Sequence, residues 1–186
     1  MRRTLAALLV LAAGTACGSE SETAPAPAPR TLPAAALPEL ASRARTLHPA
    51  AVAADALQPA SVERLLDEAG YVTGREREFS GRTKIFDHVV ARTLVFETPL
   101  GAGTYVAWLQ GHGDDVLGRA ERAKLAAPGD DAAVFTLAPC GTCKKELPTF
   151  FAGWRRGETV LTLLAAGSGA NPKRFSALAR RLDEAA

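Results

Sequence analysis

Apolar and polar residues are arranged along most of this chain in two different periods, one typical of strands and one of helices. Residues 89–97 (VVARTLVFE) are rich in β-branched and aromatic side chains and predict the clearest strand. Further strands are predicted at residues 71–79, 132–137, 150–154 and 159–164. The last two are separated by a short polar turn (RRGE), so we expect them to form a hairpin.

Three segments repeat apolar residues at helical spacing, and each has a recognisable start. Ser61, Thr98 and Asn171 are expected N-caps, and Pro99 and Pro172 are expected in the first turns that follow. The apolar stripes are Val62, Leu65, Leu66 and Ala69; Ala102, Tyr105, Val106 and Leu109; and Phe175, Leu178, Ala179 and Leu182. Each stripe predicts a helix with one buried face.

The order is helix, two strands, helix, three strands, helix. Strands joined by short turns, with helices between pairs of strands, predict an α+β fold with an antiparallel sheet and helices packed mainly on one face. We expect a single domain over residues 39–186. The alanine-rich residues 39–58 are compatible with a helix, but Pro49 and Pro59 interrupt the pattern, so we assign no element there.

The N-terminal residues resemble a lipoprotein signal peptide. Arg2 and Arg3 precede an apolar run at residues 5–13, and three small residues lead to Cys17. This resembles the lipobox of bacterial lipoproteins, which implies that residues 1–16 are removed and that Cys17 is acylated. The protein would then be lipid-anchored on the extracytoplasmic face of the cell membrane. An ordinary secretory signal with an incidental cysteine is the alternative.

Residues 17–38 are expected to be a tether. After the anchor cysteine the chain is polar (GSESET) and then alternates alanine with proline. Alternating proline favours an extended polyproline-II conformation, so we expect a solvated stalk between the lipid anchor and the domain.

Composition narrows the class of partner. The formal net charge of +2 disappears once Arg2 and Arg3 leave with the signal peptide, because the remaining basic residues then equal the 20 acidic ones. A neutral domain argues against nucleic-acid binding and against electrostatic attachment to anionic lipid. With 47% hydrophobic residues, the chain can build one substantial core.

Two segments resemble actinobacterial cell-envelope lipoproteins, which share an α+β sensor-type domain with the extracellular part of some mycobacterial receptor kinases. They are residues 89–108, with Phe96, Glu97, Thr98 and Trp108, and the hairpin at residues 153–160. The resemblance implies a secreted, non-enzymatic domain with a groove or pocket. We expect a binding or sensing module without a cofactor. Its ligand would be a small apolar molecule, a cell-wall fragment or an envelope protein. The resemblance transfers no catalytic residue to this chain.

Cys140 and Cys143 are the sharpest chemical motif. The sequence Cys-Gly-Thr-Cys after a predicted strand resembles a thioredoxin-type redox motif, in which a helix begins at the first cysteine and contains a proline, here Pro148. Few residues follow the motif, however, and Pro139 takes the place of the usual aromatic residue. A structural disulfide is the favoured interpretation, because two cysteines outside the cytoplasm usually pair. A redox pair is the alternative.

A zinc site is a third interpretation of these cysteines, since His48, His88 or His112 could complete a tetrahedron. No two histidines have ligand spacing, so we expect no metal. The remaining candidates have plainer explanations. Residues 111–115 (GHGDD) predict a helix end, and residues 101–103 lack the context of a phosphate-binding loop. Residues 167–169 (GSG) offer a hydroxyl without a partnered base and predict a turn before the last helix, and residues 155–156 predict a hairpin tip. Trp108 and Trp154 fit core positions or an apolar pocket.

Overall fold

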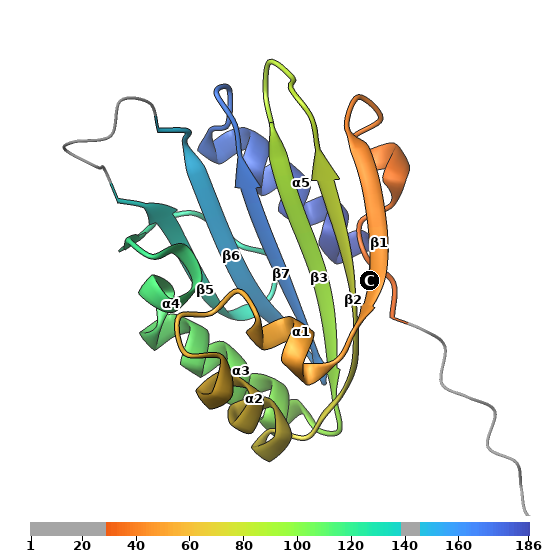
Figure 1. Ribbon diagram of the computed structural model, residues 1–186, viewed down its shortest axis with the longest axis vertical. Helices are drawn as coiled ribbons and strands as arrows, with labels where there is room; N and C mark the ends of the chain where they lie inside the picture. The colour runs from red at the N-terminus through yellow and green to blue at the C-terminus, as the bar shows by residue number, and fades with distance from the viewer. Residues whose placement is uncertain (1–28, 139–145) are drawn as a thin grey trace, which may run out of the picture.

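The computed structural model describes residues 29–138 and 146–186 (Figure 1). The strands are β1 (Ala41–Leu47), β2 (Tyr71–Ser80), β3 (His88–Phe96), β4 (Ala120–Arg122), β5 (Asp130–Leu137), β6 (Thr149–Arg156) and β7 (Thr159–Ala166). The helices are η1 (Ala34–Ala36), α1 (Pro49–Ala53), α2 (Pro59–Glu68), α3 (Pro99–Gly111), α4 (Gly113–Leu117) and α5 (Pro172–Ala185).

The strands form one antiparallel sheet in the order β1-β2-β3-β7-β6-β5-β4. The two halves of the sheet meet where β3 pairs with β7, strands far apart along the chain. The predicted α+β class and the antiparallel sheet are confirmed.

Helices lie on both faces of the sheet, but most lie on one. Helix α5 runs behind the sheet, and α1, α2, α3 and α4 gather over the lower part and one side of the front face (Figure 1). Strand β3 shows how the alternation divides the core: Val89 and Ala91 pack with α5, whereas Leu94 and Phe96 pack with α2 and α3. Above these two residues, the front face has no helix over it, and a groove lies there.

Two of the three predicted helix starts are confirmed. The Thr98 side chain accepts a hydrogen bond from the backbone N of Gly101 at 3.1 Å, and Asn171 accepts one from Arg174 at 3.0 Å. The third was wrong in detail. Helix α2 begins at Pro59, two residues before Ser61, because proline suits a first helical turn and ends a helix only from its interior.

Two strands were not expected. Strand β1 falls within the unassigned residues 39–58 and pairs with β2 along its whole length. Strand β4 is only three residues long. Both lie at the edges of the sheet, where one side of the strand stays open to solvent, so neither carries the strong apolar alternation of a central strand. In the β6–β7 hairpin, Arg155 and Arg156 end the strand instead of forming the turn.

The packed part of the chain begins earlier than expected. Leu32 is fully buried and Leu37 nearly so, both against the α5 side of the sheet. The Thr93 hydroxyl donates to the backbone oxygen of Arg30 at 2.6 Å, and the Thr31 hydroxyl donates to that of Ala91 at 3.2 Å. The predicted tether over residues 17–38 therefore needs correction at its C-terminal end, since Arg30 and Thr31 bond to β3 and Leu32 and Leu37 are part of the core.

Candidate functional site

The groove lies on the front face of the sheet, above the helices that cover the lower part. Its volume is about 290 Å³, at the lower limit of small-molecule sites. Its lining residues come mainly from β1, β2, β3, β6 and β7, with two from the helical side: Arg45, Asp55, Glu76, Glu78, His88, Val90, Arg92, Val116, Phe151, Thr162 and Leu164. One end of this lining is charged and the other is apolar.

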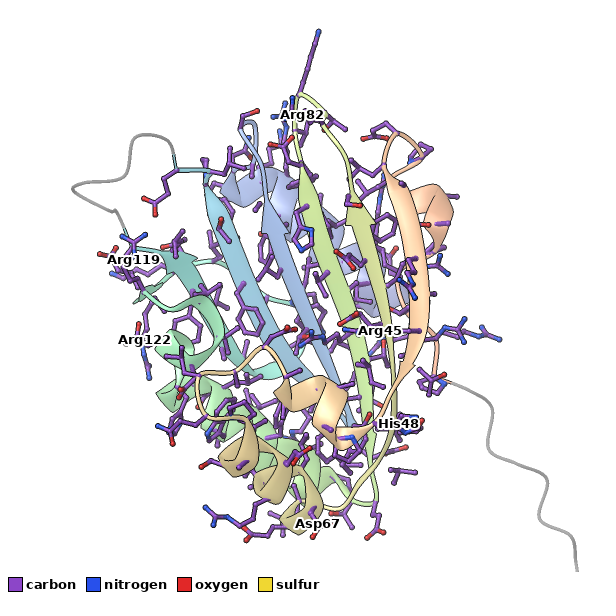
Figure 2. The ribbon with its side chains drawn as sticks, in the orientation of Figure 1. Arg45, His48, Asp67, Arg82, Arg119 and Arg122 are labelled. Atoms are coloured by element: carbon purple, nitrogen blue, oxygen red, sulfur yellow. The ribbon has the colours of Figure 1, made fainter. Side chains whose placement is uncertain are left out.

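A charged cluster forms the floor of the charged end. Arg45, Glu76 and Arg92 occupy paired positions on the neighbouring strands β1, β2 and β3. Nε of Arg45 donates to Oε1 of Glu76 at 2.7 Å, and Nε of Arg92 donates to Oε2 at 2.6 Å. Both carboxylate oxygens are thus engaged by guanidinium groups. Figure 2 shows Arg45 on this face of the sheet.

Asp55 completes the cluster from outside the sheet. It follows α1, and its Oδ2 lies 2.5 Å from Nη2 of Arg92. The three groups differ strongly in exposure: the side chain of Asp55 is 69% exposed, that of Arg92 16% and that of Glu76 4%. The pair between Arg92 and Glu76 is therefore part of the interior, whereas Asp55 lies at the surface.

The charged groups of the cluster stabilise one another in their ionised forms. Burial alone raises the pKa of Glu76, but hydrogen bonds and positive charge from Arg45 and Arg92 outweigh it, so the pKa falls below its ordinary value. For Arg92, burial lowers the pKa, and the negative charges of Glu76 and Asp55 more than reverse that effect. Glu76 is therefore ionised at neutral pH and has no proton to donate, and each of its oxygens already accepts a hydrogen bond from an arginine.

A smaller apolar pocket of about 40 Å³ adjoins the groove beside α1 and α2. Asp55, Arg92, Val116, Phe151 and Thr162 line both cavities. The remaining lining residues are mostly apolar and come from the helices: Val52, Ala56, Val62, Tyr105, Trp108, Leu109 and Asp115. The contact between Asp55 and Arg92 thus stands at the boundary between a charged groove and an apolar pocket.

Trp108 stands at the edge of this pocket in a row of rings. It stacks on Tyr105 with ring centroids 5.9 Å apart, and His112 stacks on its other face at 4.9 Å. Nδ1 of His112 also lies 2.8 Å from the backbone oxygen of Trp108. Of the two positions considered for Trp108, the core and an apolar pocket, it takes the second, since it lines this pocket. Trp154 is fully buried in the core instead, where its Nε1 donates to Asp183 at 3.1 Å.

The three histidines proposed as zinc ligands occupy separate places. His48 precedes α1, where Figure 2 shows it below Arg45, His88 begins β3 and His112 follows α3. Nδ1 of His88 lies 3.7 Å from Oε1 of Glu78 at the groove. Within residues 29–138 and 146–186, no three side chains of histidine, cysteine, aspartate or glutamate are grouped as metal ligands.

The lipidation residue Cys17 and the pair Cys140 and Cys143 lie outside the described residues. The surroundings of the pair nevertheless bear on the redox alternative. Residues 146–148 are not helical, and β6 begins at Thr149. Pro148 therefore does not lie within a helix, as the proline of the thioredoxin-type motif does.

The glycine-rich candidates have structural explanations. A Cβ at Gly101 would lie 1.9 Å from the backbone oxygen of Ala69, so this glycine lets α3 approach the end of α2. A Cβ at Gly169 would lie 2.1 Å from the backbone oxygen of Lys84, where two loops meet.

At the end of β6, Arg155 contacts Asp131 at 2.9 Å and Arg156 contacts Asp183 at 3.6 Å. These two arginines are paired and do not form an unpartnered tip.

Sequence reasoning missed the charged cluster of the groove. Arg92 is the charged residue within an otherwise apolar strand, and β2 carries the alternating run Arg-Glu-Arg-Glu at residues 75–78. A charged residue in a central strand needs a buried partner or an opening to solvent, so these two patterns were the available signal. The partners themselves depend on register, which the sequence does not display.

Comparison with known proteins gives one distant likeness. No protein-family model matches the chain, and no curated protein does. Among solved structures, it is similar to the extracellular domain of PknH from Mycobacterium tuberculosis, with 13% sequence identity and a TM-score of 0.43. The match covers 78% of this chain and 82% of that one. A likeness this low assigns neither a function nor a site residue.

In the described ranges, no helix is long and apolar enough to cross a membrane.

Proposed function

We propose that this protein is a lipid-anchored, extracytoplasmic binding module whose ligand occupies the groove on the front face of the sheet. The observation that carries the proposal is the groove itself: a concave, helix-free part of the sheet that combines an ion-paired floor with an apolar wall. Small-molecule sites are typically concave and combine apolar surface with convergent polar groups, and this groove sets its charged side chains beside Val90, Phe151 and Leu164. Signalling of occupancy to an envelope partner would make the module a sensor.

The chemistry of the groove favours binding over catalysis. A general acid or base must exchange a proton near neutral pH, and a nucleophile needs such a group beside it. Glu76 has a lowered pKa, and both its oxygens accept hydrogen bonds from arginines. The most buried carboxylate of the groove thus serves to hold charge and geometry in place.

The proposed anchor is Cys17. The signal-peptide pattern ends at this residue, and the packed domain begins near Arg30, which leaves a short connecting segment to span. Replacing Cys17 by alanine should abolish incorporation of labelled palmitate and leave an uncleaved or released chain. Labelled palmitate in the Cys17→Ala variant, or wild-type protein found soluble in the cytoplasm, would contradict the anchor.

Ligand binding in the groove can be tested by filling the groove with a larger side chain. Val90 lines the groove, whereas Val72 on the neighbouring strand is 57% exposed and does not line it. Native mass spectrometry of protein purified from membranes should find a co-purified small molecule in the wild type and in Val72→Trp, and none in Val90→Trp. Equal amounts of co-purified molecule in the wild type and both variants, or none in the wild type, would count against a ligand in the groove.

A further inference from the structure

We infer that the ligand of the groove is an amphiphile with a single carboxylate head, and that its head takes the place of Asp55 on Arg92. The inference rests on the proposed function and specifies the class of ligand. It follows from the charge balance of the cluster, from the exposure of Asp55 and from the position of Asp55 between the two cavities.

The charge balance of the floor is uneven without Asp55. Two guanidinium groups, those of Arg45 and Arg92, share the one buried carboxylate of Glu76. The excess positive charge is met at Arg92 by Asp55, whose Oδ2 lies 2.5 Å from Nη2. A carboxylate at this position is therefore what the floor of the groove requires, whether it comes from the chain or from a ligand.

Asp55 is the member of the cluster that can leave. Its side chain is 69% exposed, and a carboxylate that moves from Arg92 into water keeps its hydration. Glu76 is 4% exposed and held by two arginines, so it stays when Asp55 is displaced.

Displacement of Asp55 joins two cavities of different character. Asp55 and Arg92 line both the charged groove and the apolar pocket beside α1 and α2. Val116 and Phe151 also belong to both linings and offer continuous apolar contact from one to the other. A ligand with its carboxylate on Arg92 therefore has an apolar surface on each side for its chain.

The charges in the groove lining favour a ligand with a single negative charge. Glu78 lines the groove two residues along β2 from Glu76, and Nδ1 of His88 lies 3.7 Å from its Oε1. This second carboxylate in the lining repels a dianionic phosphate head more strongly than a carboxylate. The apolar side chains of Val90 and Leu164 line the same groove and suit an acyl chain.

The test uses the full lipid-anchored chain in nanodiscs, with empty discs as the blank, and calorimetric titration with octanoate, octan-1-ol and octylammonium. We expect octanoate to bind at least tenfold more tightly than the other two. Asp55→Asn should tighten octanoate binding about threefold to fivefold, because the internal competitor is gone, and leave octan-1-ol unchanged. Glu68→Gln, which removes an exposed carboxylate on α2, should match the wild type.

Two further variants separate the possible failures. Arg92→Lys keeps the charge beside Glu76 but loses the planar fork, so it should weaken octanoate binding at least fivefold. Val90→Trp should block all three probes. If octan-1-ol binds as well as octanoate, Val90→Trp blocks both and Asp55→Asn changes neither, the carboxylate inference is overturned while the proposed function stands. If Val90→Trp leaves octanoate binding intact, or if no probe binds the wild type, a carboxylate ligand does not occupy the groove and the inference is overturned.

Discussion

Nε of Arg92 donates a hydrogen bond to Oε2 of Glu76 at 2.6 Å, across directly paired positions of β3 and β2. This places two charges in largely buried positions, since the side chain of Glu76 is 4% exposed and that of Arg92 is 16% exposed. Such a pair offsets its own desolvation only when its hydrogen bonds are satisfied, and removal of one partner leaves the other charge buried without compensation. Loss of either partner is therefore expected to be costly.

The first prediction concerns the buried carboxylate. Glu76→Gln should lower the free energy of unfolding by about 3 kcal/mol, because it leaves two guanidinium groups facing a neutral amide. Glu78→Gln on the same strand removes a half-exposed carboxylate and should change the free energy by less than about 0.5 kcal/mol. Urea unfolding followed by circular dichroism measures both. An equal, small effect of the two variants would contradict the role assigned to Glu76.

The second prediction is the acid dependence of the same group. The folded-state pKa of Glu76 lies below its ordinary value of 4.5, so its contribution to stability is complete above about pH 4.5. That contribution is lost as the pH falls through the lower folded-state pKa. The difference in unfolding free energy between wild type and Glu76→Gln should therefore shrink from pH 6 to pH 3. A difference that stays constant over this range would show that the charge of Glu76 is not what stabilises the fold.

Local sequence patterns predict several elements of this fold but not the contacts between its strands. The strand at residues 89–97 was found because its composition is strongly β-forming, and α3 and α5 were found because Thr98 and Asn171 cap them within the local sequence. The contact of Arg92 with Glu76 depends instead on register between two strands, which is set by the packing of the whole sheet. Strand β1 was missed for a related reason, since its pattern is that of a solvated edge.

The two tyrosines offer a direct optical test of the core. Burial is the main cause that raises the pKa of Tyr71 and that of Tyr105 to about 12, and the hydroxyl of Tyr71 donates to the backbone oxygen of Leu47 at 2.8 Å. The chain has no other tyrosine. Absorbance at the tyrosinate band should therefore not rise near pH 10 in the folded protein, but should rise there in urea.

The same shift predicts loss of stability in alkali. A group whose pKa is raised on folding stabilises the protein below its unfolded pKa, here about 10, and loses that contribution as the pH rises towards 12. Unfolding free energies should thus decline between pH 10 and pH 12. A native-state tyrosinate signal that titrates near pH 10 without unfolding would show that the two rings are more open to water than the structure has them.

The fourth prediction concerns the approach of α3 to the end of α2. A Cβ at Gly101 would lie 1.9 Å from the backbone oxygen of Ala69, so Gly101→Ala must push the two helices apart. We expect a loss of about 2 kcal/mol or more, as for other overpacked sites. Gly111→Ala at the end of the same helix meets no atom within 4 Å and should be neutral or slightly stabilising. Equal effects in thermal unfolding would contradict the close packing of α2 and α3.

The last prediction concerns Cys140 and Cys143, which lie outside the described residues between β5 and β6. We expect them to be oxidised to each other in purified protein, so mass spectrometry after alkylation without reductant should find no labelled thiol at either position. The double variant Cys140→Ser, Cys143→Ser should lower stability only modestly, because a ring this short restricts the unfolded chain little. Octanoate binding in the groove should survive in this double variant.

A redox pair would behave differently: its reduced form would hold a thiolate of low pKa, and the wild type would reduce insulin disulfides while the double variant would not. We expect the structural pair, because two cysteines outside the cytoplasm usually pair with each other.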